Sequence, residues 1–265
     1  MSDIKNQQVN IMIIGVGNHA RRIYIPILKK FEEKYQIKLV CGIEVVGCES
    51  MVHEYLMDRN YEMEVTYVPK FDVSIKALPE EIKKTLNQVV RDKNISAVVI
   101  STEPLVHKVY AMWAIENGLN ILMDKPICLR KDVVSNMSAA SGLVEDYNEL
   151  LNSYNLLQKK KETIFSINVQ RRYEPGFQKV FDLIRETRDR FNIPVTSIQA
   201  QHADGVWIFP QEILEQQCHP YNQGYGKASH SGYHIFDIVW QIYKNGLIEN
   251  KSPEAAEVLS SMVQP

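Results

Sequence analysis

Short apolar runs alternate with amphipathic stretches over the first half of the chain. The runs predict buried strands at residues 11–14, 38–44, 96–101 and 119–123. A weaker run predicts a further strand at 65–68. Between them, apolar side chains recur at helical spacing and predict helices near residues 20–31, 47–59, 78–93 and 105–114. Such alternation predicts an α/β fold of the Rossmann type, a doubly wound parallel sheet with helices on both faces.

A glycine turn follows the first strand directly, in the pattern Gly15-x-Gly17-x-x-Ala20. The first glycine permits a tight turn, the second lets a pyrophosphate approach the backbone, and the small third residue lets helix and strand pack closely. Free N–H groups and the helix dipole would receive the negative charge. We therefore expect Gly15, Gly17, Asn18, His19 and Ala20 to bind a dinucleotide. Pro26 lies inside the following helical stripe and predicts a kink or irregular first turns.

Glu44 ends the second predicted strand, 24 residues beyond Ala20. A carboxylate there accepts hydrogen bonds from both ribose hydroxyls of the adenosine and repels a 2′-phosphate. No lysine or arginine follows until Arg59, which favours NAD(H), with NADP(H) open as the alternative. The competing interpretation is a glycine turn that only joins strand and helix, with Glu44 solvated.

Composition narrows the class of protein. The 265 residues are 45% hydrophobic and 23% charged, which is typical of a folded chain, and the formal net charge of −2 attracts neither nucleic acid nor a membrane surface. The first residues lack the apolar core of a signal peptide, so we expect a cytoplasmic protein. The four cysteines are scattered and predict reduced packing residues: Cys41, Cys48, Cys128 and Cys218.

The alternation stops after Pro126, which places a domain boundary near Cys128. Residues 1–128 would form the dinucleotide-binding domain, and residues 129–265 an α+β domain with an open, partly antiparallel sheet for substrate binding and oligomerisation. The predicted elements of this second domain are a helix at 131–161 broken around Tyr154, strands at 163–170 and 195–201, and a helix near 177–184. The last sheet would be short. We expect either a homo-oligomer that covers its edge or a truncated form of a longer chain.

Several motifs together resemble the Gfo/Idh/MocA family of nicotinamide-dependent oxidoreductases. Besides the glycine turn, the matching segments are Glu103-Pro104-Leu105-Val106-His107, Asp124-Lys125-Pro126, Arg171-Arg172-Tyr173-Glu174-Pro175, and the spacing of Gly232, His234 and Asp237. Glu103 stands where the family has a small polar residue. The resemblance implies hydride transfer to or from a secondary alcohol or ketone of a sugar, polyol or related cyclic substrate. It also implies cofactor contacts from Thr102, Pro104, His107, Asp124 and Lys125.

Hydride transfer at an alcohol carbon needs a group that moves the hydroxyl proton and positive charge near the oxygen. By the resemblance, Lys125 polarises the oxygen and His234 is the general acid and base. The alternatives are a surface lysine at 125 and a packed, hydrogen-bonded histidine at the start of a helix. We expect Asp237 to cap or brace that helix rather than react. Arg172, Tyr173, His230 and His234 are the expected substrate contacts.

One position departs from the family pattern, because His230 stands where many members carry an aspartate. This substitution leaves open a sensor or regulatory protein that binds a nucleotide without turnover. An inert structural fragment is a third interpretation. We predict no metal site, although His230 and His234, with Cys218 and His219 upstream, leave zinc as a weaker alternative.

Overall fold

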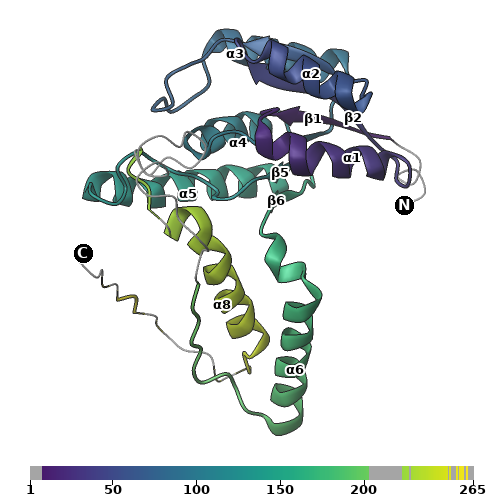
Figure 1. Cartoon of the computed structure of the whole chain (residues 1–265). Helices are drawn as coiled ribbons and strands as arrows, with labels where there is room; N and C mark the ends of the chain where they lie inside the picture. Colours follow the sequence, from purple (N-terminus) through teal and green to yellow (C-terminus); the bar gives the residue numbers. More distant parts are fainter. Residues whose placement is uncertain are drawn as a thin grey trace. The chain divides into compact units, whose positions relative to one another are not determined.

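Six strands form one parallel sheet in the described part of this computed structural model, which covers residues 8–202, 223–226, 228–249, 251, 255, 257–259 and 261. The spatial order is β3-β2-β1-β4-β5-β6 (Figure 1). All five neighbouring pairs are parallel. This is the strand order of a doubly wound dinucleotide-binding sheet, so the predicted fold class is confirmed. The strands are β1 (Val9–Ile14), β2 (Ile37–Val45), β3 (Glu64–Val68), β4 (Ala97–Ile100), β5 (Asn120–Met123) and β6 (Phe165–Ile167).

Helices cover both faces of the sheet, because alternate residues of β1 point into two different cores. Ile11 and Ile13 pack in one core with residues of α1 (Ile25–Glu32) and α2 (Glu49–Arg59). Met12 and Ile14 pack in the other with α3 (Glu80–Asp92), α4 (His107–Glu116) and α5 (Met137–Gln158). The unbroken apolar run at the start of the chain is therefore a strand buried on both sides, as predicted.

The irregular first turns predicted near Pro26 are confirmed, and a glycine ends a second helix. The stretch before α1 is a π-helical turn, η2 (Ala20–Tyr24), and Pro26 lies in the first turn of α1, where a proline is tolerated. Gly118 has φ +61° after α4, so it ends that helix in the left-handed conformation that favours glycine.

The segment after β5 differs from the prediction. Residues 131–135 are turns, Asn136 caps α5, and α5 then continues without a break at Tyr154. The Tyr154 ring packs edge-on against Phe165 at 5.6 Å, and its hydroxyl donates to the Thr163 carbonyl at 2.7 Å. These contacts hold β6 against α5, while β6 pairs with β5 in the sheet. The first compact unit therefore runs to Asn168 and includes the described residues 223–226 and 228–230, whereas the sequence placed a boundary near Cys128.

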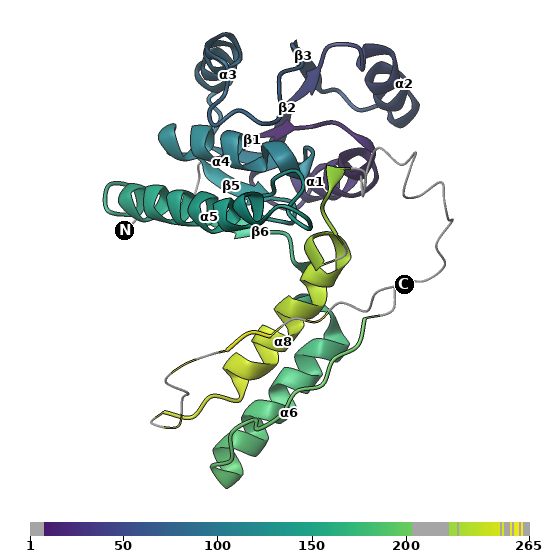
Figure 2. The same cartoon turned by 90° about the vertical axis from the view of Figure 1, so that its left-hand side faces the viewer.

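The second compact unit comprises, among the described residues, 169–202 and those from Ser231 onward. Its helices are η4 (Gln170–Tyr173), α6 (Pro175–Phe191) and α8 (Tyr233–Asn245). The turn η6 (Ala228–Gly232), whose first three residues belong to the first unit, leads into α8. The helices α6 and α8 lie side by side in both views (Figures 1 and 2). The Arg188 guanidinium donates to the Asn245 carbonyl at 3.0 Å and so ties the end of α8 to α6.

The strand predicted at residues 195–201 is wrong, since these residues are described and have no strand pairing. A strand is stable only when its backbone groups pair with a neighbour, and the described residues of this unit contain no other strand. The open, partly antiparallel sheet is accordingly absent from the described part of the second unit. No helix within the described ranges is long and apolar enough to cross a membrane.

An ion-pair network joins α4, α5 and the segment after β5. Asp146 on α5 accepts hydrogen bonds from Arg130 at 2.6 and 2.9 Å and from the Lys108 ammonium at 2.5 Å. Arg130 lies across α5 at Gly142, where a Cβ atom would be 1.6 Å from its Nη1. Burial alone would raise the pKa of Asp146, but the hydrogen bonds from Arg130 and Lys108 outweigh it and lower that pKa.

We predict that Asp146→Asn lowers the free energy of unfolding by about 2 kcal/mol at pH 7, because it removes the charge that Arg130 and Lys108 share. The folded-state pKa of Asp146 is lowered, so its contribution is present at neutral pH and is lost as the pH falls below about 4. Urea unfolding of wild type and variant at pH 7 and at about pH 3.5, just below the ordinary aspartate pKa, measures both effects.

Glu145→Gln is the matched control, since Glu145 is 79% exposed and 3.9 Å from Arg130. Equal losses in the two variants would contradict the assigned role of Asp146.

Candidate functional site

The carboxyl ends of β1, β2, β4 and β5 bring four of the predicted segments to one edge of the sheet. In a doubly wound sheet, ligands bind where the loops after neighbouring strands leave toward opposite faces. Here β1 lies between β2 and β4, its own loop leads to η2 and α1, and the loop after β4 leads to α4 on the other face.

The glycine turn has one glycine that the fold requires and one that it does not. Gly15 has φ +87°, and a Cβ atom there would lie 2.6 Å from the Ser101 carbonyl oxygen. Ala20 is fully buried, so a larger side chain has no room. A Cβ atom on Gly17, by contrast, would meet nothing within 4 Å. The space above Gly17 is therefore open on the side from which a pyrophosphate would approach the backbone.

Ser101 lies beside the glycine turn. Its hydroxyl is buried and has no hydrogen-bond partner among the residues that the structure describes. Buried hydroxyl groups are normally paired, so this hydroxyl is an exception.

Glu44 is held against the glycine turn. One carboxylate oxygen accepts a hydrogen bond from the Val16 backbone N–H at 2.7 Å, and the other accepts from the Val45 N–H at 2.8 Å. Each oxygen keeps a second lone-pair direction, which a ribose hydroxyl can use. The Glu44 carboxylate therefore lies beside the glycine turn, oriented by two backbone donors.

His107 is a brace beneath the site. It is fully buried, with Nδ1 2.7 Å from the Pro126 carbonyl oxygen and Nε2 3.1 Å from the Thr102 carbonyl oxygen. Burial lowers the pKa of His107, and it outweighs the two carbonyl contacts, which would raise it. The sequence predicted that His107 contacts the cofactor. In the structure it has no exposed surface and instead ties the Thr102 segment to the Lys125-Pro126 segment.

A polar cluster lies at the end of β5. Asp124 accepts a hydrogen bond from the Lys125 N–H at 2.9 Å and lies 3.6 Å from Nε2 of His19. The His19 ring meets the buried Tyr24 ring edge-on at 5.3 Å, and the Asn168 amide donates to the Tyr24 hydroxyl at 2.6 Å. Burial and the Asp124 charge raise the pKa of Tyr24. His19 and Asp124, predicted separately, are thus neighbours.

Sequence reasoning missed Tyr24 and Asn168. It assigned Tyr24 to an apolar helical stripe, where its hydroxyl was the only sign of another role. Asn168 directly follows β6, and a polar residue at the carboxyl end of a parallel strand is a usable signal once that strand is placed in the sheet.

Lys125 is partly exposed and begins the cis Lys125–Pro126 peptide. Burial is the main cause of the lowered pKa of His107, and the positive charge of Lys125 adds to it. A cation at the end of this strand can stabilise negative charge that develops on a reacting oxygen.

In the second unit, Arg172 and Asp237 form a two-point ion pair. The Nε–Oδ2 distance is 3.0 Å, and Nη2 donates to Oδ1. The Asp237 side chain is 7% exposed, so the pair holds η4 against α8. Tyr173 is 69% exposed, and His234 is buried in the first turn of α8.

Three predicted positions lie outside the described parts. They are the His230 side chain, Cys218 and His219. Within the described ranges, no group of three or more His, Cys, Asp or Glu side chains could hold a metal ion.

Comparison with known proteins agrees with this geometry. Residues 9–145 match the family model GFO_IDH_MocA, described as an oxidoreductase family with an NAD-binding Rossmann fold. No curated protein sequence matches the chain.

Solved structures share the fold at low sequence identity. An aldose-aldose oxidoreductase from Caulobacter crescentus, complexed with glycerol, has a TM-score of 0.60 and 14% identity over 90% of this chain and 58% of its own. GenD2 from gentamicin A biosynthesis, in complex with NAD, has a TM-score of 0.56 and 13% identity over 90% of this chain and 54% of its own. An NAD-binding protein from Listeria innocua has a TM-score of 0.52 and 14% identity over 88% of this chain and 54% of its own. The chain thus spans little more than half the length of these structures.

We predict that His107 makes stability fall as the pH drops below about 6.5. The unfolded chain takes up a proton there, whereas the buried imidazole resists it, so stability changes by up to about 1.4 kcal/mol per pH unit. Urea unfolding of wild type and His107→Gln between pH 8 and pH 5 tests this (a range of about three units that spans the ordinary histidine pKa). The variant should lose this part of the slope.

His53→Gln is the control, since His53 is an exposed residue of α2. A slope that is the same in wild type and His107→Gln would show that His107 does not titrate between these states.

Proposed function

The chain belongs to the Gfo/Idh/MocA family of oxidoreductases, and from this premise we propose that it is an NAD(H)-dependent dehydrogenase or reductase. The proposed substrate is a secondary alcohol or ketone of a sugar, polyol or related cyclic compound. The observation that carries the proposal is the meeting of the open glycine turn, the oriented Glu44 carboxylate and the Asp124-Lys125 pair at one edge of the sheet.

The cofactor would be held by the turn from Gly15 to Ala20 and by Glu44. Backbone N–H groups and the helix N-terminus receive the pyrophosphate, and the carboxylate accepts from the adenosine ribose. The same carboxylate repels a 2′-phosphate, which supports NAD(H) over NADP(H). When bound, the nicotinamide accepts or supplies the hydride.

The chain's own residues would handle charge and protons at the substrate oxygen. We assign to Lys125 the stabilisation of negative charge on that oxygen, and to His234 the proton that the oxygen gains in the reductive direction. Among the proposed substrate contacts, Tyr173 is exposed, whereas the Arg172 guanidinium is engaged by Asp237. The likeness to the aldose-aldose oxidoreductase supports, at the level of the fold, a sugar or polyol substrate.

A nucleotide-binding sensor without turnover is the competing function. His230, at the position where the resemblance expects an aspartate, favours it, because a neutral imidazole does not supply the fixed negative charge of a carboxylate.

We predict saturable NADH binding by the purified chain, followed by nicotinamide fluorescence, with weaker binding of NADPH. Glu44→Ala should weaken NADH binding roughly tenfold and reduce the preference over NADPH, because the ribose acceptor and the charge are both lost.

Gly17→Ala should weaken the binding of both nucleotides while leaving the thermal unfolding midpoint close to wild type, since its Cβ meets no protein atom within 4 Å. Failure of the wild type to bind either nucleotide would overturn the proposed function.

We predict that Lys125→Ala lowers the reduction rate of a ketosugar by roughly 100-fold or more, because a charge aimed at the developing oxyanion is removed. Its NADH affinity should stay within a few-fold of wild type. Initial rates over a panel of ketosugars and polyols measure the effect, with exposed Lys70→Ala as the matched control. A wild type that binds NADH but turns over no member of the panel would instead support the sensor.

A further inference from the structure

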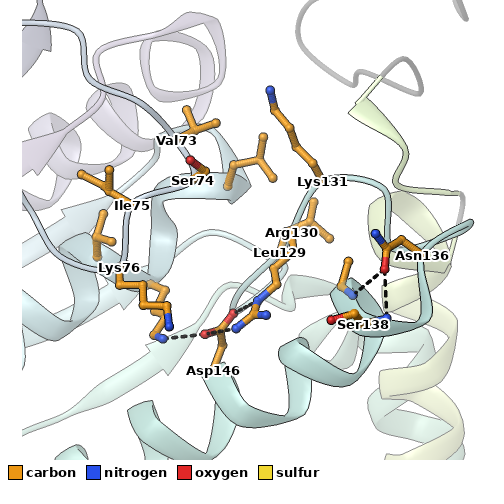
Figure 3. Close-up of a pocket in the computed structure, with 14 residues that line it drawn as sticks. Val73, Ser74, Ile75, Lys76, Leu129, Arg130, Lys131, Asn136, Ser138 and Asp146 are labelled. Carbon is orange, nitrogen blue, oxygen red and sulfur yellow. Dashed lines mark hydrogen bonds and ion pairs between the residues drawn. The ribbon is translucent and has the colours of Figure 1, made fainter.

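A cavity of about 370 Å³ opens beside the candidate site, between the loop after β3, the start of α4 and the segment that leads into α5 (Figure 3). Its lining contains no residue of the glycine turn, and it excludes Glu44, Thr102, Asp124 and Lys125. Its size falls within the range of small-molecule sites. The apolar part of the wall consists of Val73, Ile75, Leu105, Val109 and Leu129.

Four of the lining side chains are cationic and one is acidic. The cations are Lys76, Lys108, Arg130 and Lys131, and the acid is Asp146. Figure 3 shows Asp146 with its ion-pair contacts at one side of the cavity, where they hold Arg130 in a defined orientation.

The remaining positive charge comes from two loops. Lys76 follows β3 and Lys131 follows β5, and neither has an ion pair within 4.0 Å in the part of the chain that the structure describes. Their ammonium groups can therefore reorient toward a ligand without first breaking a salt bridge.

Nearby acids cancel only part of this charge. Glu149 is half-exposed and outside the lining, but it pairs with Lys108 at 2.5 Å, and this pairing reduces the net charge of the wall from +3 to +2. Glu145 is largely exposed. Asp72 accepts a hydrogen bond from the Ser74 N–H at 2.9 Å, and these Ser74 contacts, more than Lys131, lower its pKa.

We infer that this cavity binds a small organic dianion with an apolar body, of the kind represented by a phosphate monoester or a dicarboxylate. A doubly negative head matches the net charge of the wall, and lysine ammonium groups bind phosphate as point charges. The Ser138 hydroxyl lines the same cavity and adds a neutral donor, while the apolar wall receives the rest of the ligand. The site is separate from the one proposed for the dinucleotide.

Calorimetric titration with phenyl phosphate and with glutarate tests the inference, with phenyl sulfate as the monoanion of matching shape. We expect at least one dianion to bind saturably and phenyl sulfate to bind at least tenfold more weakly. Lys76→Gln combined with Lys131→Gln should weaken the dianion at least tenfold. The matched control combines Lys70→Gln with Lys84→Gln, two exposed lysines outside the lining, and should leave binding unchanged.

Two comparisons identify the charged group of the ligand and test whether its site is separate from the dinucleotide site. Binding of phenyl phosphate alone assigns a phosphate, and binding of glutarate alone assigns a dicarboxylate. The titrations are repeated with NADH present, which should not displace the dianion. Absence of binding by both dianions, an equal loss in the two double variants, or displacement by NADH would overturn the inference. None of these results depends on turnover, so the oxidoreductase proposal can fail or stand separately.

Discussion

The central position of β1 is the constraint on which the rest of the structure depends. At its end, Ile14 accepts a hydrogen bond from the Ser101 N–H at 2.8 Å, and the Gly15 N–H donates to the Ile43 carbonyl at 2.9 Å. The chain must then turn within a space where even a Cβ atom would strike Ser101. This turn starts the helix on one face while the loop after β4 starts a helix on the other, and the divergence creates the edge at which ligands bind.

Backbone contacts, rather than pairs of side chains, orient the candidate cofactor site. Glu44 reaches the Val16 N–H, and His107 reaches the carbonyl groups of Thr102 and Pro126. These backbone groups lie just beyond the ends of β1, β4 and β5, so the side chains hydrogen-bonded to them are held close to the edge of the sheet. The arrangement therefore exists before any ligand arrives, which reduces the ordering that binding requires.

Charge at this edge is organised in two different ways. Asp124 lies beside the rings of His19 and Tyr24, and its charge favours a higher pKa for Tyr24 and for His107. Around Asp146 the acid is surrounded by cations, which lower its own pKa. The first arrangement suits proton chemistry near a reacting group, and the second orients fixed positive charge around a cavity.

The sequence by itself determined the parts that local patterns describe. The apolar run at 11–14 predicted a buried strand, and the glycine turn and Pro26 predicted how the next helix begins. Only the tertiary structure decided which distant segments meet. The three-residue β6 is a strand because β5 offers a free edge, whereas residues 195–201 lack a described partner despite a strand-like pattern. Periodicity reports which face of a segment is buried, but pairing depends on a neighbour that the local sequence does not contain.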